Sequence, residues 1–83
     1  MSDKSFHILI VEDEIKIAEI LSDYLSQAGF SVSHKDSGDG VVALVKSTPP
    51  DLILLDVMLP GMDGLEICKE VRKFSTVPII MIS

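Results

Sequence analysis

Three acidic residues directly follow two apolar runs of the sequence. Glu12 and Asp13 come after residues 8–11, and Asp56 comes after residues 52–55. If both runs are parallel strands of one sheet, their carboxyl ends meet at one edge and bring the three carboxylates together. Close carboxylates repel, so such a cluster takes up a proton or binds a cation. Mg²⁺, which uses one or two carboxylates with water and a substrate phosphate, is the simpler solution at neutral pH and makes phosphoryl chemistry the leading class.

Glu12 and Asp13 also have a purely structural explanation. Acidic side chains between a strand and a helix are favoured by helix capping and by the helix dipole, so these two residues alone leave both interpretations open. Asp56 is harder to explain in that way. It follows a wholly apolar run, and an acid in such a place usually has a partner or a function.

The spacing of apolar residues predicts the elements that position these acids. Strands are expected at 6–11, 30–35, 51–55 and 77–83, with 30–35 at an edge of the sheet. Helices are expected at 14–28, after the turn 37–40, and after the capping residue Asp63. Strands and helices that alternate in this way are typical of the α/β class, with a parallel sheet, helices on both faces and right-handed crossovers.

Two of these helices carry an apolar stripe that we expect to face the sheet. On the first helix it consists of Ile17, Ile20, Leu21, Tyr24, Leu25 and Ala28. On the last helix it consists of Leu65, Ile67, Cys68, Val71 and Phe74. Cys68 is therefore interpreted as a core residue, while His7 and His34, which have no ligand-spaced partner, are interpreted as structural or surface groups.

The composition describes one small acidic domain that covers residues 1–83. Its hydrophobic content of 47% is enough for a core, and its net charge of −6 is unlike the basic surface of a nucleic-acid reader. The apolar runs are too short to span a membrane, and one cysteine permits no disulfide within the chain. We therefore expect a cytoplasmic chain that binds neither a membrane nor, directly, a nucleic acid.

Three segments of the sequence resemble the receiver domain of two-component response regulators, in particular the winged-helix transcription-factor branch. They are Ile-Leu-Ile-Val-Glu-Asp-Glu at 8–14, Asp-Leu-Ile-Leu-Leu-Asp-Val-Met-Leu-Pro-Gly-Met-Asp-Gly at 51–64 and Val-Pro-Ile-Ile-Met-Ile-Ser at 77–83. Their order and spacing extend the resemblance over essentially the whole chain. The resemblance implies a flavodoxin-like parallel sheet with strand order 2-1-3-4.

The resemblance also implies a role for each site residue. Asp56 is expected to accept a phosphoryl group from a histidine kinase, and Ser83 to be the hydroxyl switch that contacts this group. Mg²⁺ is expected to be held by the carboxylates of Asp13 and Asp56, by the main-chain carbonyl of Met58, and by Glu12 through a water. Such a chain is a phosphoacceptor with at most weak self-phosphorylation and dephosphorylation, and is not classed as an enzyme.

The sequence also differs from the complete family pattern. A complete receiver continues with a fifth strand, which carries a lysine that pairs with the phosphoryl group, and with two further helices. We therefore expect a receiver truncated after its fourth strand, with impaired phosphorylation. An uncovered fourth strand is expected to join copies of the chain into a homo-oligomer.

Two other functions fit the sequence less well. A haloacid-dehalogenase-like phosphatase needs a second acid two residues after Asp56, where this chain has Met58. A dinucleotide site needs a glycine-rich turn after the first strand, and this chain has no glycine there. The alternative that remains open is a non-catalytic interaction or oligomerisation fragment with the same fold. Uptake of a phosphoryl group by Asp56 distinguishes this alternative from the receiver.

Overall fold

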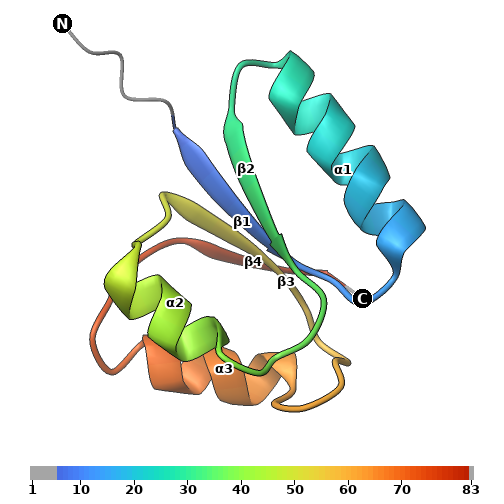
Figure 1. Cartoon of the computed structure of the whole chain (residues 1–83). Coiled ribbons are helices and arrows are strands. Elements are labelled where there is room, and N and C mark those ends of the chain that lie inside the picture. Colours follow the sequence, from blue (N-terminus) through green and yellow to red (C-terminus); the bar gives the residue numbers. More distant parts are fainter. Residues whose placement is uncertain (1–5, 83) are drawn as a thin grey trace, which may run out of the picture.

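The computed structural model describes residues 6–82, which form four strands in alternation with three helices (Figure 1). The strands are β1 (His7–Val11), β2 (Ser31–Lys35), β3 (Leu52–Asp56) and β4 (Ile79–Ile82). The helices are α1 (Ile15–Gln27), α2 (Val41–Ser47) and α3 (Gly64–Val71). Among these residues, no helix combines the length and the apolarity that a membrane crossing requires. The alternation of strands and helices confirms the predicted α/β class.

All strand pairs of the sheet are parallel, and the strands lie in the order β2-β1-β3-β4. The predicted order and the edge position of β2 are therefore confirmed. Val11 at the end of β1 is in register with both Lys35 and Leu55, so three strands end at nearly the same level. This alignment brings the residues that follow β1 close to the last residue of β3, Asp56.

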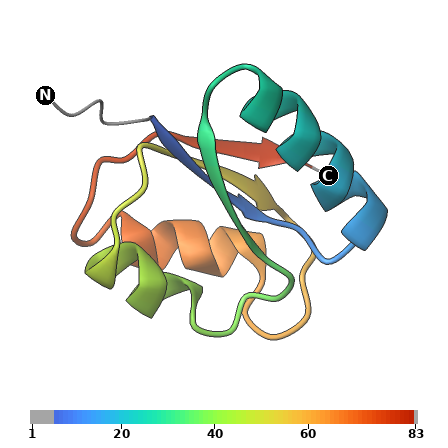
Figure 2. The same ribbon diagram turned by 45° about the horizontal axis from the view of Figure 1, so that its top comes forward.

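The helices cover both faces of the sheet, with α1 on one face and α2 and α3 on the other (Figure 2). The core beneath α2 and α3 consists of Leu9, Val11, Val41, Val45, Ile53, Leu55, Ile67 and Val71. The core beneath α1 consists of Ile8, Ile10 and Ala18. Successive residues of β1 thus alternate between the two cores, which is why the whole run 8–11 is apolar.

The buried face of α1 is narrower than the sequence pattern predicted. Ala18 is buried against the sheet, and Leu21 and Leu25 pack beside it at the three- and four-residue spacing of one helical stripe. The apolar residues to the side of this stripe lie outside the contact, and Tyr24 is 74% exposed. The prediction is wrong for four residues, which are exposed: Ile17, Ile20, Tyr24 and Ala28.

The buried face of α3 is also narrower than predicted. Ile67 and Val71 are buried, whereas Leu65 on the first turn is exposed. Phe74 lies beyond the last helical residue and is exposed beside Lys46, whose Nζ is 5.0 Å from the ring centroid. These two residues were wrongly assigned to the core. The predicted cap is confirmed, because the Asp63 carboxylate accepts a hydrogen bond from the N–H of Glu66 at 3.0 Å.

β4 begins later than predicted, at Ile79. Pro78 lies outside the strand and has no N–H to donate, although its carbonyl accepts a hydrogen bond from the N–H of Ile53 at 3.0 Å. Within residues 6–82, β4 pairs with β3 alone and is an edge of the sheet. Ser83, the predicted hydroxyl switch, lies outside the described residues.

Candidate functional site

The structure brings together the three acids that the sequence singled out. Glu12 and Asp13 follow β1, Asp56 ends β3, and each offers a carboxylate oxygen such that the three oxygens lie within 4.8 Å of one another. Glu12 is 4% exposed and Asp56 is 9% exposed, whereas Asp13 is open to solvent. The cluster therefore has a buried floor and one exposed carboxylate through which solvent can reach it.

Hydrogen bonds hold both buried acids in place. The N–H of Glu14 donates to Glu12 Oε2 at 3.1 Å, and the N–H of Glu12 donates to the carbonyl of Lys35 at 3.0 Å. The N–H of Met58 donates to Asp56 Oδ1 at 3.1 Å. Main-chain donors thus orient the two carboxylates, so that neither depends on a flexible side chain for its position.

The surroundings of Glu12 disfavour its ionised form. Burial is the main cause that raises the pKa of this carboxyl, and the nearby carboxylates of Asp56 and Asp13 raise it further, against the opposing hydrogen bond from Glu14. A divalent cation among the three acids would remove this repulsion, and carboxylate oxygens are the ligands that Mg²⁺ prefers. The donor set fits a hard cation and lacks the histidine and thiolate ligands of a softer metal.

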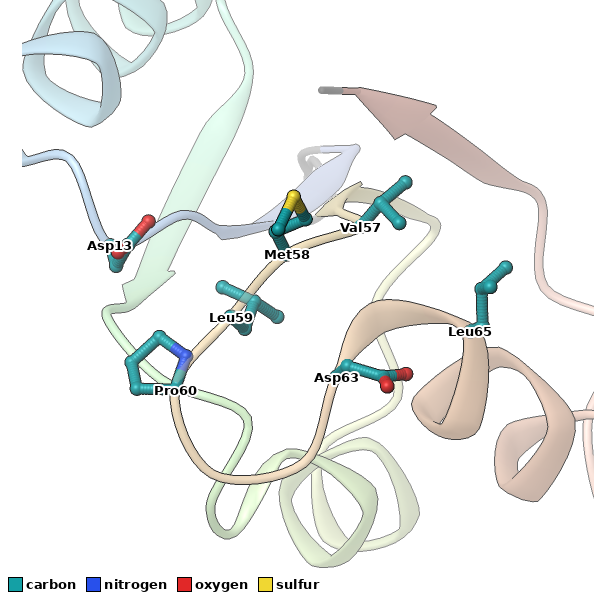
Figure 3. Close-up of a pocket in the computed structure, with 7 residues that line it drawn as sticks. All are labelled: Asp13, Val57, Met58, Leu59, Pro60, Asp63 and Leu65. Atoms are coloured by element: carbon teal, nitrogen blue, oxygen red, sulfur yellow. The ribbon is translucent and has the colours of Figure 1, made fainter.

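Two cavities meet at Asp13. One has a volume of about 420 Å³ and is formed by the loop after β3 and the start of α3 (Figure 3), with Asp13, Val57, Met58, Leu59, Pro60, Asp63 and Leu65 as its lining. The other has a volume of about 370 Å³ and contains all three acids, next to Glu14, Ile17, Leu21 and Ile82. Met58, the residue expected to supply a main-chain ligand, lines the first cavity and is 79% exposed. Each cavity therefore has at least one of the three acids in its wall.

The loop after β3 is held by close main-chain contacts at glycines. The N–H of Gly38 donates to the carbonyl of Pro60 at 3.0 Å, and a Cβ at Gly38 would overlap the main chain of Met62. The N–H of Gly64 donates to the carbonyl of Val57 at 2.9 Å, and a Cβ there would overlap the carbonyl of Asp56. The sequence predicts Gly38 only as part of a turn, since its partner lies in a distant segment.

The two histidines make different contacts. His7 lies between two hydroxyls of β2, with Nδ1 3.1 Å from Ser31 Oγ and Nε2 2.9 Å from Ser33 Oγ, and links the two strands far from the acids. His34 Nε2 lies 2.8 Å from the main-chain carbonyl of Glu12 and so contacts the site itself. Sequence reasoning missed this second contact, because no spacing in the chain relates residue 34 to residue 12.

Comparisons with known proteins agree with this fold. The response regulator receiver domain family matches residues 8–83. The transcriptional regulatory protein BaeR of Escherichia coli O6:H1 is 54% identical over 76 residues, which are 92% of this chain and 32% of BaeR. The chain thus spans about one third of the length of this curated relative.

Solved structures give the same result. The BeF₃-activated N-terminal receiver domain of Klebsiella pneumoniae RstA has a TM-score of 0.86 and 33% identity, over 90% of this chain and 64% of that one. The N-terminal domain of a response regulator receiver protein from Methanoculleus marisnigri has a TM-score of 0.87 and 29% identity, over 96% of this chain and 68% of that one.

Proposed function

The chain belongs to the response regulator receiver domain family, and from this premise we propose that Asp56 accepts a phosphoryl group from a phosphohistidine of a histidine kinase. The observation that carries this proposal is the convergence of Glu12, Asp13 and Asp56 within 4.8 Å at the carboxyl ends of β1 and β3. Ligands of open parallel sheets bind at this edge.

Mg²⁺ is the cofactor that fits these residues. The carboxylates of Asp13 and Asp56 and the main-chain carbonyl of Met58 would hold it, with Glu12 acting through a water. The fit is supported by the raised pKa of Glu12, whose burial beside two other acids leaves negative charge for a cation to neutralise. When bound, Mg²⁺ supplies positive charge to the oxygens of the transferring phosphoryl group.

The transfer step uses the Asp56 carboxylate as the nucleophile. One carboxylate oxygen attacks phosphorus, a new P–O bond forms, and the P–N bond of the phosphohistidine breaks so that the electron pair leaves with the imidazole. The product is an acyl phosphate on Asp56. The N–H of Met58 orients the nucleophile through Oδ1 before the reaction. In this role the chain is a phosphoacceptor.

Mass spectrometry of the intact chain tests this function. After incubation with acetyl phosphate and Mg²⁺ we expect the added mass of one phosphoryl group, and we expect none after chelation of the metal. Asp56→Asn should take up none, whereas Asp36→Asn, an exposed acid outside the cluster, should react like the wild type. A wild-type chain that takes up no phosphoryl group, or an Asp56→Asn chain that takes up as much, contradicts the proposal.

The family membership favours the receiver over the alternative of a non-catalytic fragment. We also propose that copies of the chain associate through β4, because within residues 6–82 its outer main-chain groups have no partner strand and Ile80 is 51% exposed. A hydroxyl switch at Ser83, a cytoplasmic location, impaired phosphorylation and the lack of direct nucleic-acid binding stay predictions.

A further inference from the structure

We propose that His34 is a positioning residue that fixes the Glu12–Asp13 segment, and thereby two of the three acids, at the distance from Asp56 that the site requires. His34 Nε2 lies 2.8 Å from the Glu12 carbonyl oxygen. A carbonyl oxygen can only accept, so Nε2 carries the hydrogen and donates. As far as it concerns Mg²⁺, the inference rests on the proposed function.

The contact replaces a main-chain hydrogen bond at the end of a strand pair. β1 and β2 exchange regular hydrogen bonds, from the N–H of Ser31 to the carbonyl of Phe6 up to the N–H of Glu12 to the carbonyl of Lys35. The Glu12 carbonyl is the next acceptor in this alternation. Its hydrogen bond comes from the His34 side chain, because β2 ends at Lys35 and the chain turns away.

The segment beyond this point needs such a hydrogen bond. Glu12 and Asp13 carry like charges toward Asp56, and the mutual repulsion of the three carboxylates favours movement of the segment away from β3. The main-chain pairing of β1 with β2 ends with the N–H of Glu12, which donates to the carbonyl of Lys35. The His34 hydrogen bond attaches β2 to the carbonyl of Glu12, one peptide group further along the chain. The nitrogen of that peptide group belongs to Asp13, the exposed acid. His34, a donor on the edge strand β2, therefore sets the position of Asp13, the acid that solvent reaches first.

Two substitutions separate the hydrogen bond from the bulk of the ring. His34→Gln keeps an N–H donor of similar reach, and His34→Leu keeps an apolar side chain without a donor. His7→Leu is the matched control, because His7 also bonds across β1 and β2 but contacts Ser31 and Ser33 far from the acids. If His34→Leu does not fold, His34→Thr, which suits an edge strand and is too short to reach the carbonyl, takes its place.

The first measurement uses the metal-free chain. In NMR spectra, loss of the hydrogen bond in His34→Leu should shift the Glu12 carbonyl carbon and the Asp13 amide nitrogen upfield and speed hydrogen exchange of the Glu12 amide about tenfold. His34→Gln should restore both signals, and His7→Leu should leave both unchanged. Signals in His34→Leu that match the wild type overturn the inference, whether or not the chain binds metal.

The second measurement is a Mg²⁺ titration followed by the amide signal of Asp13. We expect His34→Leu to bind Mg²⁺ about fivefold more weakly than the wild type, and His34→Gln to bind within about twofold of it. Equal affinity in His34→Leu overturns the positioning role, and a weakened affinity that His34→Gln does not rescue does the same. A wild-type chain without Mg²⁺ affinity counts against the proposed function instead, and the metal-free spectra then decide the role of His34.

Discussion

Glu12 is a residue whose ionised form the folded state disfavours. Its folded-state pKa is raised above the ordinary value, so the folded chain binds this proton more tightly than the unfolded chain does. The corresponding stability is fully present below the unfolded-state pKa and is lost as the pH rises through the folded-state pKa. At neutral pH without metal, an ionised Glu12 therefore destabilises the fold.

A substitution at Glu12 tests this sign. Without metal at pH 7, we expect Glu12→Gln to raise the free energy of unfolding by about 1 kcal/mol, because the amide keeps an oxygen for the N–H of Glu14 and removes the buried charge. The advantage should vanish near pH 4, where the wild type binds the proton. Urea unfolding at both pH values measures it, with the exposed Glu19→Gln as the control. An equal or lower stability of Glu12→Gln at pH 7 contradicts the burial argument.

Asp13 differs from Glu12, because it is exposed and lies where both cavities meet. Its substitution should therefore affect metal binding more than stability. We expect Asp13→Asn to weaken Mg²⁺ binding about tenfold while the free energy of unfolding changes by less than about 0.5 kcal/mol. Titration of Mg²⁺ or Mn²⁺, read from amide shifts near the acids, measures the first quantity. Asp23→Asn on α1 serves as the control. Unchanged affinity in Asp13→Asn would remove this residue from the metal ligands.

At the scale of elements, the loop after β3 depends on the turn before α2. The N–H of Gly38 bonds the carbonyl of Pro60, and there is no room for a Cβ beside Met62. We expect Gly38→Ala to lower the free energy of unfolding by about 3 kcal/mol and to shift the amide signals of residues 57–62. Chemical denaturation and NMR measure these effects.

Gly29→Ala is the comparison that separates two causes. Gly29 has φ +98° and open space around it, so its substitution carries only the conformational penalty of about 1 kcal/mol. Gly38 does not have the positive φ of Gly29, so its penalty comes from the overlap with Met62. If Gly38→Ala is no more destabilising than Gly29→Ala, the turn before α2 does not hold the loop after β3 in place.

The sequence predicts the elements and the meeting of the acids because both follow from local patterns. The runs 8–11 and 52–55 end in acids, and parallel strands bring those ends together. The buried face of α1 could not be predicted in the same way, because apolar residues surround much of the helix. Only contact with the sheet selects Ala18, Leu21 and Leu25 as the residues that pack against it. The bonds of His34 and Gly38 escape prediction because each joins segments that no local pattern relates.

On the scale of the whole molecule, we propose that copies of the chain meet through the edge strand β4. Its main-chain groups on the outer side have no partner strand within residues 6–82, and Ile80 is exposed on it. We expect Ile80→Lys to shift the chain toward the monomer, since a charge on an edge strand opposes strand pairing. Light scattering after size exclusion, from micromolar to millimolar concentration, measures the effect.

Leu65→Lys is the control for this experiment. Leu65 is also an exposed apolar residue, but it lies on the helix α3 and not on a strand. This variant should associate like the wild type. A wild type that stays monomeric throughout the concentration range, or equal association of all three chains, contradicts assembly through β4.

We propose that the acidic cluster directs a phosphoryl group to one carboxylate, that of Asp56. The most direct test is to locate the group on the wild-type chain after reaction with acetyl phosphate and Mg²⁺. Borohydride reduces an acyl phosphate to the alcohol, and peptide mapping then identifies the residue. We expect reduction at Asp56 alone, in a yield that depends on Mg²⁺. Reduction at Glu12 or Asp13, or a phosphoryl group that resists borohydride because it is on a hydroxyl, would contradict it.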